Sequence, residues 1–296
     1  MTILKTTPLT DTFGVIVHEI DLADVTETHL FPELRALFEE HSALLIKGQE
    51  LPSEVHLRLA KMFGPVEDRL SDERKEGYKE EVRPVSNVTE TGNLTGEMDM
   101  HTLHLIANQQ WHIDSTFIPT PSLINILTAK VPTDEGGETE LASTRAAFAA
   151  LTPEQQDELR GMKFRHKYSH SRERISPELA KHPMFHKWPP QCWPAIWANP
   201  VNGKEGIFVA SHVYQIEGRS AEDSQPFIDA LIEHCTQPQF TYSHKWEKGD
   251  VLMWDQRATL HRGMPWDLSK PRHLDSVCVS MTDADGLASA RAAVAA

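Results

Sequence analysis

The residues with the clearest chemical potential lie in the run NQQWHIDSTF, residues 108–117, where a histidine and an aspartate stand two positions apart. We expect this run to form a β-strand, and in a strand residues i and i+2 point to the same side. The imidazole of His112 and the carboxylate of Asp114 would then lie next to each other. They would provide two ligands for a divalent metal, and a second histidine elsewhere in the chain would complete a two-histidine, one-carboxylate site.

The same pair also fits an ordinary hydrogen-bonded contact inside the protein. The chain has 16 histidines, and a histidine on a strand is more often a core or surface residue than a metal ligand. The H-x-D spacing also recurs at His273 and Asp275. The pattern around His112 is therefore weak evidence for a metal until a third ligand is found.

A distant segment, DVLMWDQRATLHRGMPWDLSKPRHLDS, contains a suitable third ligand. An apolar strand is expected to end at Trp254 and Asp255, and after a turn His261 begins the next strand. Arg272 follows eleven residues after His261, where it could return on a neighbouring strand and point into the same cavity. A guanidinium group binds a carboxylate through two parallel hydrogen bonds. The segment thus predicts a metal site beside a carboxylate clamp, which a 2-oxo acid co-substrate requires.

Taken jointly, the patterns W-H-x-D-x-[ST]-F, G-G-x-T and W-D-x-R-x-x-x-H-R resemble the Fe(II)/2-oxoglutarate dioxygenases of the taurine and 2,4-dichlorophenoxyacetate dioxygenase family. The resemblance covers almost the entire chain, and HRGMPWDLSKPR is especially similar to the phenoxypropionate (dichlorprop-type) members. It implies an enzyme that uses O2 to convert 2-oxoglutarate to succinate and CO2 while hydroxylating a small organic acid. Hydroxylation next to an ether oxygen or a sulfonate cleaves the product, as family members do with aryloxyalkanoates and taurine.

The resemblance also implies roles for individual residues. His112, Asp114 and His261 match the iron ligands. Thr139 matches the threonine, and Arg272 the arginine, that bind the distal carboxylate of 2-oxoglutarate. Related halogenases replace the carboxylate ligand with a small residue, so the presence of Asp114 favours oxygen insertion. A non-catalytic metal-binding jelly roll is an alternative, but it would not need the clamp formed by Thr139 and Arg272.

The residues around the primary substrate follow the family less closely. Many members have a second arginine, four residues after the first, that binds the anionic head of the substrate, but this chain has Ser276 there, preceded by Asp275. A serine hydroxyl does not neutralise a buried anion, so a cationic or zwitterionic substrate that Asp275 would contact is an alternative. Each remaining candidate also has an ordinary structural explanation as a cap, strand end or core residue. The candidate substrate contacts are Asn108, His212, Ser276 and Ser86, with Trp254 as a pocket wall.

The elements that must position these residues are mainly strands. After two strands and two helices near the start, strands are predicted at PVSNV, SLINILTAKV, GETELAS, GIFVAS, FTYSHKW, DVLMWD, TLHRG and LDSVCVSM. Helical insertions are expected at 145–162 and 221–238. This density of strands predicts a double-stranded β-helix (jelly roll) with helical insertions, in one domain over residues 1–296. Asp255 and Arg257 are expected to orient the loop that carries His261.

Composition limits the possible partners. The chain has 43 acidic against 29 basic residues, a formal charge of −14, which disfavours nucleic acid and anionic membranes. No apolar run of eighteen residues and no signal peptide is present, and the three separated cysteines fit reduced thiols. We therefore expect a cytoplasmic enzyme with a small-molecule substrate, and a homo-oligomer like its relatives. The charged segment 67–83 is predicted to be a lid, and the basic, aromatic segment 165–193 an active-site flap or oligomer contact.

Overall fold

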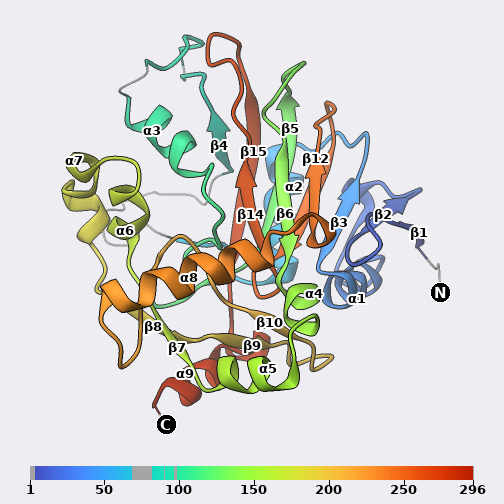
Figure 1. Cartoon of the computed structure of the whole chain (residues 1–296). Coiled ribbons are helices and arrows are strands. Elements are labelled where there is room, and N and C mark those ends of the chain that lie inside the picture. Colours follow the sequence, from blue (N-terminus) through green and yellow to red (C-terminus); the bar gives the residue numbers. More distant parts are fainter. Residues whose placement is uncertain (1–3, 69–81, 90, 97–98, 296) are drawn as a thin grey trace.

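The computed structural model describes residues 4–68, 82–89, 91–96 and 99–295. Two layers face each other, a large sheet in the order β1-β2-β3-β13-β5-β15-β4 and a small sheet in the order β12-β6-β14 (Figure 1). All neighbouring strands in these two sheets are antiparallel except β2 and β3, which are parallel. The predicted jelly-roll architecture is therefore confirmed. The strands are β1 (Lys5–Pro8), β2 (Val15–His18), β3 (Ala43–Ile46), β4 (Arg83–Ser86), β5 (Ser122–Val131), β6 (Thr139–Ser143), β12 (Thr241–His244), β13 (Val251–Asp255), β14 (Thr259–Gly263) and β15 (His273–Ser280).

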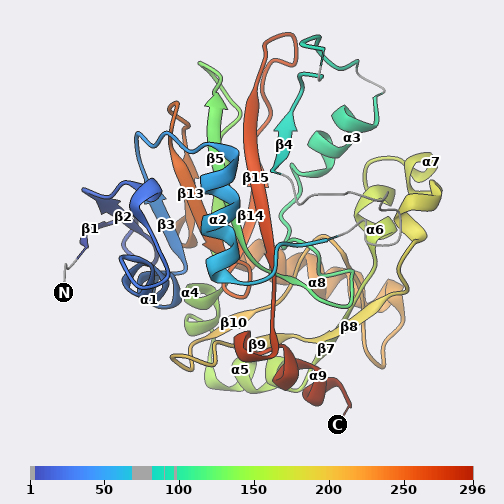
Figure 2. The ribbon, with the colours of Figure 1, turned by 180° about the vertical axis from the view of Figure 1, so that it is seen from behind.

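Helices cover the outer face of the large sheet and the base of the molecule. Figure 2 shows α2 lying across β5 and β15, while α8 and the two smaller sheets, β11-β7-β8 and β10-β9, lie below the two layers. Among the described residues, no helix combines the length and apolar character needed to cross a membrane. The remaining elements are α1 (Phe31–His41), α2 (Ser53–Phe63), α3 (Met100–Ala107), α4 (Thr144–Ala149), α5 (Pro153–Arg160), α6 (Tyr168–Glu173), α7 (Pro177–Ala180), α8 (Ala221–Cys235), α9 (Leu287–Ala295), β7 (Lys163–His166), β8 (Gln191–Pro194), β9 (Ile196–Ala198), β10 (Glu205–Ile207) and β11 (Val213–Ile216).

Strand β13 illustrates how alternating side chains build the two apolar layers. Val251 and Met253 belong to the larger core cluster, whereas Leu252 and Trp254 belong to a second cluster. Successive side chains of a strand point to opposite faces, and all four are buried. The sheet therefore carries apolar cores on both faces, and the second of these clusters forms the floor on which the site is built.

The strand predicted over residues 108–117 is wrong. Within it, only His112 forms a β-bridge, to His261. The chain then turns, and Ser115 has a φ of 61°, a left-handed conformation that ends an extended strand. His112 nevertheless stays in place, because its N–H and C=O exchange 2.9 Å hydrogen bonds with those of His261. His112 and Asp114 therefore do lie side by side, as predicted, but the bridge to His261 and the turn at Ser115 bring them together instead of a strand.

Other predicted elements differ in smaller ways. The strands predicted at SLINILTAKV and TLHRG match β5 and β14 in full, whereas GIFVAS forms a strand only at its start, in β10. The insertion 145–162 forms two helices, since Thr152 caps a new helix at Pro153. The lid was predicted at 67–83, of which residues 69–81 lie outside the described residues.

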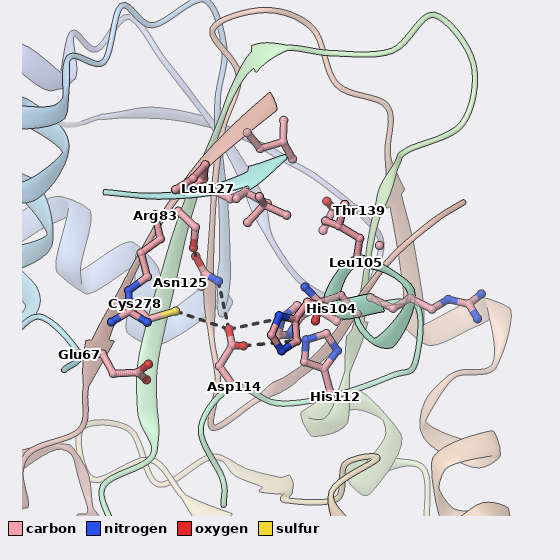
Figure 3. Close-up of a pocket in the computed structure, with 18 of the residues that line it drawn as sticks. Glu67, Arg83, His104, Leu105, His112, Asp114, Asn125, Leu127, Thr139 and Cys278 are labelled. Carbon is pink, nitrogen blue, oxygen red and sulfur yellow. Dashed lines mark hydrogen bonds and ion pairs between the residues drawn. The ribbon is translucent and has the colours of Figure 1, made fainter. Parts of the chain in front are cut away.

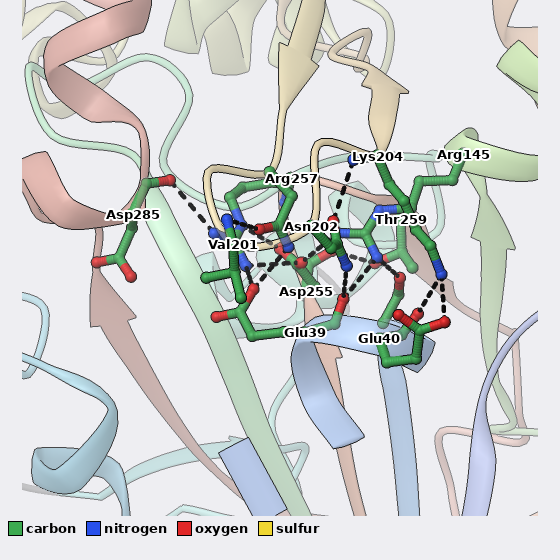
Figure 4. A network of polar contacts seen from close by, with 12 residues as sticks. Glu39, Glu40, Arg145, Val201, Asn202, Lys204, Asp255, Arg257, Thr259 and Asp285 are labelled. Carbon is green, nitrogen blue, oxygen red and sulfur yellow. Dashed lines mark hydrogen bonds and ion pairs between the residues drawn. The ribbon is translucent and has the colours of Figure 1, made fainter. Parts of the chain in front are cut away.

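A buried cluster of charges holds the turn between β13 and β14 (Figure 4). The guanidinium of Arg257 contacts Asp255 at 2.9 Å and Glu39 on α1 at 2.6 Å. Arg145 adds a contact to Asp255 at 3.2 Å. Because Asp255 and Arg257 are buried and bind each other and α1, they fix the turn that leads to His261, as expected.

Two buried histidines predict how stability depends on pH. Burial lowers the pKa of His56 to about 4 and that of His166 to about 3. Because these values lie below those of the unfolded chain, the unfolded state binds more protons, so stability is complete above pH 6.5 and falls as the pH decreases. We expect denaturant titrations to show a loss of roughly 1 to 2 kcal/mol per histidine between pH 7 and pH 5. His166→Leu should reduce this loss, and an unchanged pH dependence would contradict the assignment.

Candidate metal and co-substrate site

Three side chains converge at the edge of the small sheet in a geometry suited to a metal ion. His112, Asp114 and His261 each offer a ligand atom, and these atoms lie within 4.8 Å of one another. His112 Nε2 is 3.9 Å from Asp114 Oδ1, and His261 Nε2 is 3.5 Å from Asp114 Oδ2. Figure 3 shows the Asp114 carboxylate pointing toward the imidazole rings, with Asn125 and Cys278 on its other side. Two imidazoles and one carboxylate on one side are the donor set of an Fe(II) oxygenase centre.

Both histidines are held in the form that binds metal. His112 Nδ1 lies 2.7 Å from the carbonyl oxygen of Gln110, so this nitrogen carries the proton and Nε2 presents a lone pair. Burial, with a contribution from His112, lowers the pKa of His261 to about 3. Its imidazole is therefore neutral near pH 7 and available as a ligand.

The carboxylate of Asp114 is fixed by two amide groups. Gln256 Nε2 donates to Asp114 Oδ2 at 2.7 Å, and Asn125 Nδ2 donates to the same oxygen at 3.0 Å. The Sγ of Cys278 lies 3.7 Å from that oxygen. These contacts fix the orientation of the carboxylate that faces the two histidines.

Removing one of these amides should weaken metal binding without removing a ligand. We expect Asn125→Ala to reduce affinity for Fe(II) or Mn(II) about 10- to 100-fold, the usual effect of losing a group that orients a ligand. Calorimetric titration with Mn(II) would measure it. Ser276→Ala is the control, since Ser276 contacts Asn125 and not Asp114, and it should have a smaller effect. Equal affinity in Asn125→Ala and the wild type would contradict the assignment.

Arg272 presents a buried positive charge to the same cavity. It is 3% exposed, and burial lowers its pKa to about 10. Its Nη2 donates to the carbonyl of Gly137 at 2.7 Å, and its guanidinium lies over the ring of Trp266. Among the described residues, no carboxylate lies within ion-pair distance of it. An unpaired buried cation is unfavourable, so the site is incomplete without an anion.

The close approach of Arg272 depends on the Gly-Gly turn before β6. Gly137 has a φ of +72°, and a Cβ there would lie 2.9 Å from Arg272 Nε. The turn therefore needs glycine both for its backbone conformation and for space. Ser86 and Asn87 hold the other side of Arg272, since Ser86 Oγ donates to its carbonyl at 2.9 Å and Asn87 Oδ1 accepts its N–H at 2.8 Å.

Thr139 lines the cavity with its hydroxyl in a defined orientation. Trp246 Nε1 donates to Thr139 Oγ1 at 3.0 Å. An indole N–H is only a donor, so this bond uses a lone pair of the hydroxyl and leaves its proton for another acceptor. Thr139 and Arg272 can thus both donate hydrogen bonds to one anion in the cavity.

The metal ligands, Thr139 and Arg272 all line one cavity of about 440 Å³. Asn108 lies on its wall, as predicted, and Trp254 is both a core residue and a wall, with its ring centre 4.7 Å from that of His261. The basic, aromatic segment 165–193, for which an active-site flap or an oligomer contact was predicted, contributes part of the cavity wall. Its contributing side chains are Tyr168, Arg172, Met184, Lys187 and Trp188.

The other predicted substrate contacts lie elsewhere or are occupied. Ser86 is not among the cavity-lining residues, because its hydroxyl supports Arg272. His212 lines a smaller neighbouring cavity of about 30 Å³ beside His112 and Asp114. Ser276 lines the main cavity but donates its hydroxyl to Asn125 Oδ1 at 2.8 Å.

Asp275 does not line the cavity, so the structure removes the residue on which a cationic substrate would depend. Its neighbours in β15 point to the cavity, whereas Asp275 lies 2.9 Å from His273 Nε2 and 3.8 Å from Lys130 Nζ. The second H-x-D pattern is therefore an ordinary polar pair.

Several residues of the site were missed by the sequence reasoning. Asn125 and Cys278 face each other across β5 and β15, and Gln256 follows the W-D pattern. A polar residue inside the otherwise apolar run SLINILTAKV was the available signal for Asn125. For Trp246 and Arg83 the sequence contains no comparable indication of a role in the site, because strand pairing brings them near the cavity.

Comparison with known protein families agrees with this geometry. The model described as "Taurine catabolism dioxygenase TauD, TfdA family" matches residues 5–278. The alpha-ketoglutarate-dependent 2,4-dichlorophenoxyacetate dioxygenase of Cupriavidus pinatubonensis is 32% identical over 270 residues, covering 90% of this chain and 94% of the relative. The (S)-phenoxypropionate/alpha-ketoglutarate-dioxygenase of Sphingobium herbicidovorans is 29% identical over 273 residues, covering 90% and 91%.

A solved structure supports the same relationship. The crystal structure of AAD-2 in complex with Mn(II) and N-oxalylglycine superimposes with a TM-score of 0.87 at 28% identity. The match covers 94% of this chain and 98% of that chain. The likeness therefore extends over both sheets and the site between them.

Proposed function

Because the chain belongs to the taurine catabolism dioxygenase TauD, TfdA family, we propose that it hydroxylates a small organic acid of the aryloxyalkanoate kind. The chain is a 2-oxoglutarate-dependent dioxygenase, an oxidoreductase whose His-Asp-His triad is typical of Fe(II) binding. We assign His112, Asp114 and His261 as its iron ligands. Thr139 and Arg272 are the proposed contacts of 2-oxoglutarate, also called alpha-ketoglutarate.

One observation supports the co-substrate assignment above all others. Arg272 is a buried cation without a carboxylate partner among the described residues, and it shares a cavity with the metal triad. The distal carboxylate of 2-oxoglutarate would supply the missing anion and accept the Thr139 hydroxyl proton as well. A protein that only stored or sensed a metal would have no use for this clamp.

The residues of the chain contribute position, charge and exclusion of water. When bound, Fe(II) supplies the reaction of 2-oxoglutarate with dioxygen that oxidises the substrate. His112, Asp114 and His261 would hold the metal, and all three line the cavity in which the co-substrate and the substrate would bind. Trp254, 1% exposed, closes the floor behind His261 and keeps water away from the reacting atoms.

The charge and shape of the cavity favour an anionic, partly aromatic substrate. Its lining contains more basic than acidic side chains, although the whole chain has a charge of −14. Apolar and aromatic walls, among them Leu105, Leu127, Tyr168 and Trp188, suit an aryl group. The named relatives act on 2,4-dichlorophenoxyacetate and (S)-phenoxypropionate, and both substrate types fit this description. A cationic substrate in this cavity would not contact the carboxylate of Asp275, which lies outside the cavity.

Substrate-dependent succinate release tests the proposal. Fe(II)-loaded protein with 2-oxoglutarate and O2 should release succinate in proportion to an aryloxyacetate or phenoxypropionate, with formation of the phenol. Sulfonates, sulfate esters and amino acids complete the panel. Phenol formation without consumption of 2-oxoglutarate, or coupled turnover only with amino acids, would contradict the proposed substrate class.

A further inference from the structure

Arg83 is a cavity-lining cation that belongs neither to the metal triad nor to the clamp formed by Thr139 and Arg272. It begins β4 and pairs with Ser276 of β15 in the antiparallel register, two pairs beyond Val85 and Leu274. Residues directly opposite on neighbouring antiparallel strands project to the same face. Arg83 and Ser276 accordingly both line the main cavity, and Figure 3 draws Arg83 on the side of Asp114 away from the histidine rings.

The guanidinium of Arg83 differs from the other cavity-lining arginines that the structure describes. Arg172 lies over the Tyr168 ring at 4.7 Å, and Arg262 contacts Glu140 at 2.7 Å. Arg272 has Gly137 and the Trp266 ring, and we assign it to 2-oxoglutarate. The guanidinium of Arg83, by contrast, has no hydrogen bond, ion pair or ring contact within the described part of the chain.

The unpartnered state of Arg83 has an energetic cost. Its Nη2 atom is buried and has no hydrogen-bond partner among the described residues. A guanidinium group keeps its charge in a protein, so burial without an anion is unfavourable. Glu67 lines the same cavity, but it accepts the hydroxyl of Ser115 and forms no ion pair with Arg83. The cavity therefore has a free cationic donor group in addition to Arg272.

We propose that Arg83 binds the anionic head group of the primary substrate, a carboxylate or a sulfonate, while the apolar walls hold its body. This assignment rests on the proposed function and extends it, because it gives the substrate anion its own partner, separate from that of 2-oxoglutarate. Ser276 cannot serve in this role, since its hydroxyl proton is donated to Asn125. Arg83 is thus a residue that determines specificity for acids over neutral analogues of the same shape.

The test compares an acid with a neutral analogue in Arg83→Met. Anaerobic protein loaded with Fe(II) and 2-oxoglutarate is titrated with 2,4-dichlorophenoxyacetate or with 2-(2,4-dichlorophenoxy)ethanol, and the change in the visible band of the complex gives Kd. We expect Arg83→Met to weaken binding of the acid roughly 10- to 150-fold, the effect of one lost hydrogen bond to a charged group. Binding of the alcohol should change little. If Arg83→Met weakened binding of the acid and of the alcohol equally, the proposal would be overturned.

Two further variants separate charge from shape. Arg83→Lys should retain part of the preference for the acid, and Arg83→Ser combined with Ser276→Arg should restore it by moving the guanidinium one strand across. Thermal unfolding verifies that each variant is folded. If wild-type protein forms the band but binds no aryloxyacetate, phenoxypropionate or arylsulfonate, the anion assignment fails while the dioxygenase assignment stands. Absence of the band before any substrate is added would instead contradict the proposed function.

Discussion

Asp114→Ala is expected to abolish turnover and to reduce Fe(II) affinity by more than about 100-fold. Loss of a group that only orients a ligand costs about 10- to 100-fold, and Asp114 is assigned as a ligand itself, with its Oδ1 facing His112 Nε2 at 3.9 Å. Succinate release and Mn(II) titration would measure the two effects. His112→Ala should behave in the same way.

The chain contains a matched control for this experiment. His273 and Asp275 repeat the H-x-D spacing but bind each other outside the cavity. Asp275→Ala should therefore leave metal affinity within about twofold of the wild type, because surface substitutions usually change free energies by no more than 0.5 kcal/mol. A loss of metal binding in Asp275→Ala, or its retention in Asp114→Ala, would refute the proposed ligand set.

Arg272→Met is expected to weaken 2-oxoglutarate binding. In the absence of 2-oxoglutarate, the same substitution should stabilise the protein. Losing one partner of a buried charge pair costs 2 to 5 kcal/mol, roughly 30- to 5,000-fold in Kd. Without co-substrate, Arg272 is an unpaired buried cation whose pKa burial lowers to about 10. Its replacement by an apolar side chain should raise Tm by about 2 to 4 °C for each kcal/mol gained.

Thermal unfolding with Mn(II), in the presence and absence of 2-oxoglutarate, measures both the stability of the free protein and the binding of 2-oxoglutarate. In the wild type the co-substrate should raise Tm, and in Arg272→Met this increase should be absent at the same concentration. Arg262→Met provides the contrast, because Arg262 already contacts Glu140 and the Trp111 ring, and its loss should lower the Tm of the free protein. A destabilised Arg272→Met that still binds 2-oxoglutarate normally would contradict the clamp.

The jelly roll and the residues that converge on the metal could be predicted because both depend on local patterns. The apolar run before Asp255 marked β13, and the W-D-x-R-x-x-x-H-R pattern assigned His261 to the strand that follows the turn. The strand predicted around His112 failed because apolar neighbours also occur in a buried turn. A single bridge to His261, and not strand geometry, holds His112 there.

The surroundings of the triad depended on strand pairing, which single-sequence patterns do not reveal. Ser276 was expected to face the substrate, but the register of β5 and β15 brings it to Asn125, which in turn binds Asp114. Arg83 reaches the cavity only because β4 pairs with β15. Long-range register therefore decided which polar residues support the ligands and which remain available to a substrate.

The most direct measurement of the central claim is an anaerobic titration of Fe(II)-loaded wild-type protein with 2-oxoglutarate. If His112, Asp114 and His261 hold iron beside the Arg272 clamp, a visible charge-transfer band should appear and saturate at one equivalent. Asp114→Ala should lack the band, and Arg272→Met should require much more 2-oxoglutarate to form it. Folded protein that binds Fe(II) but gives no band would contradict the account.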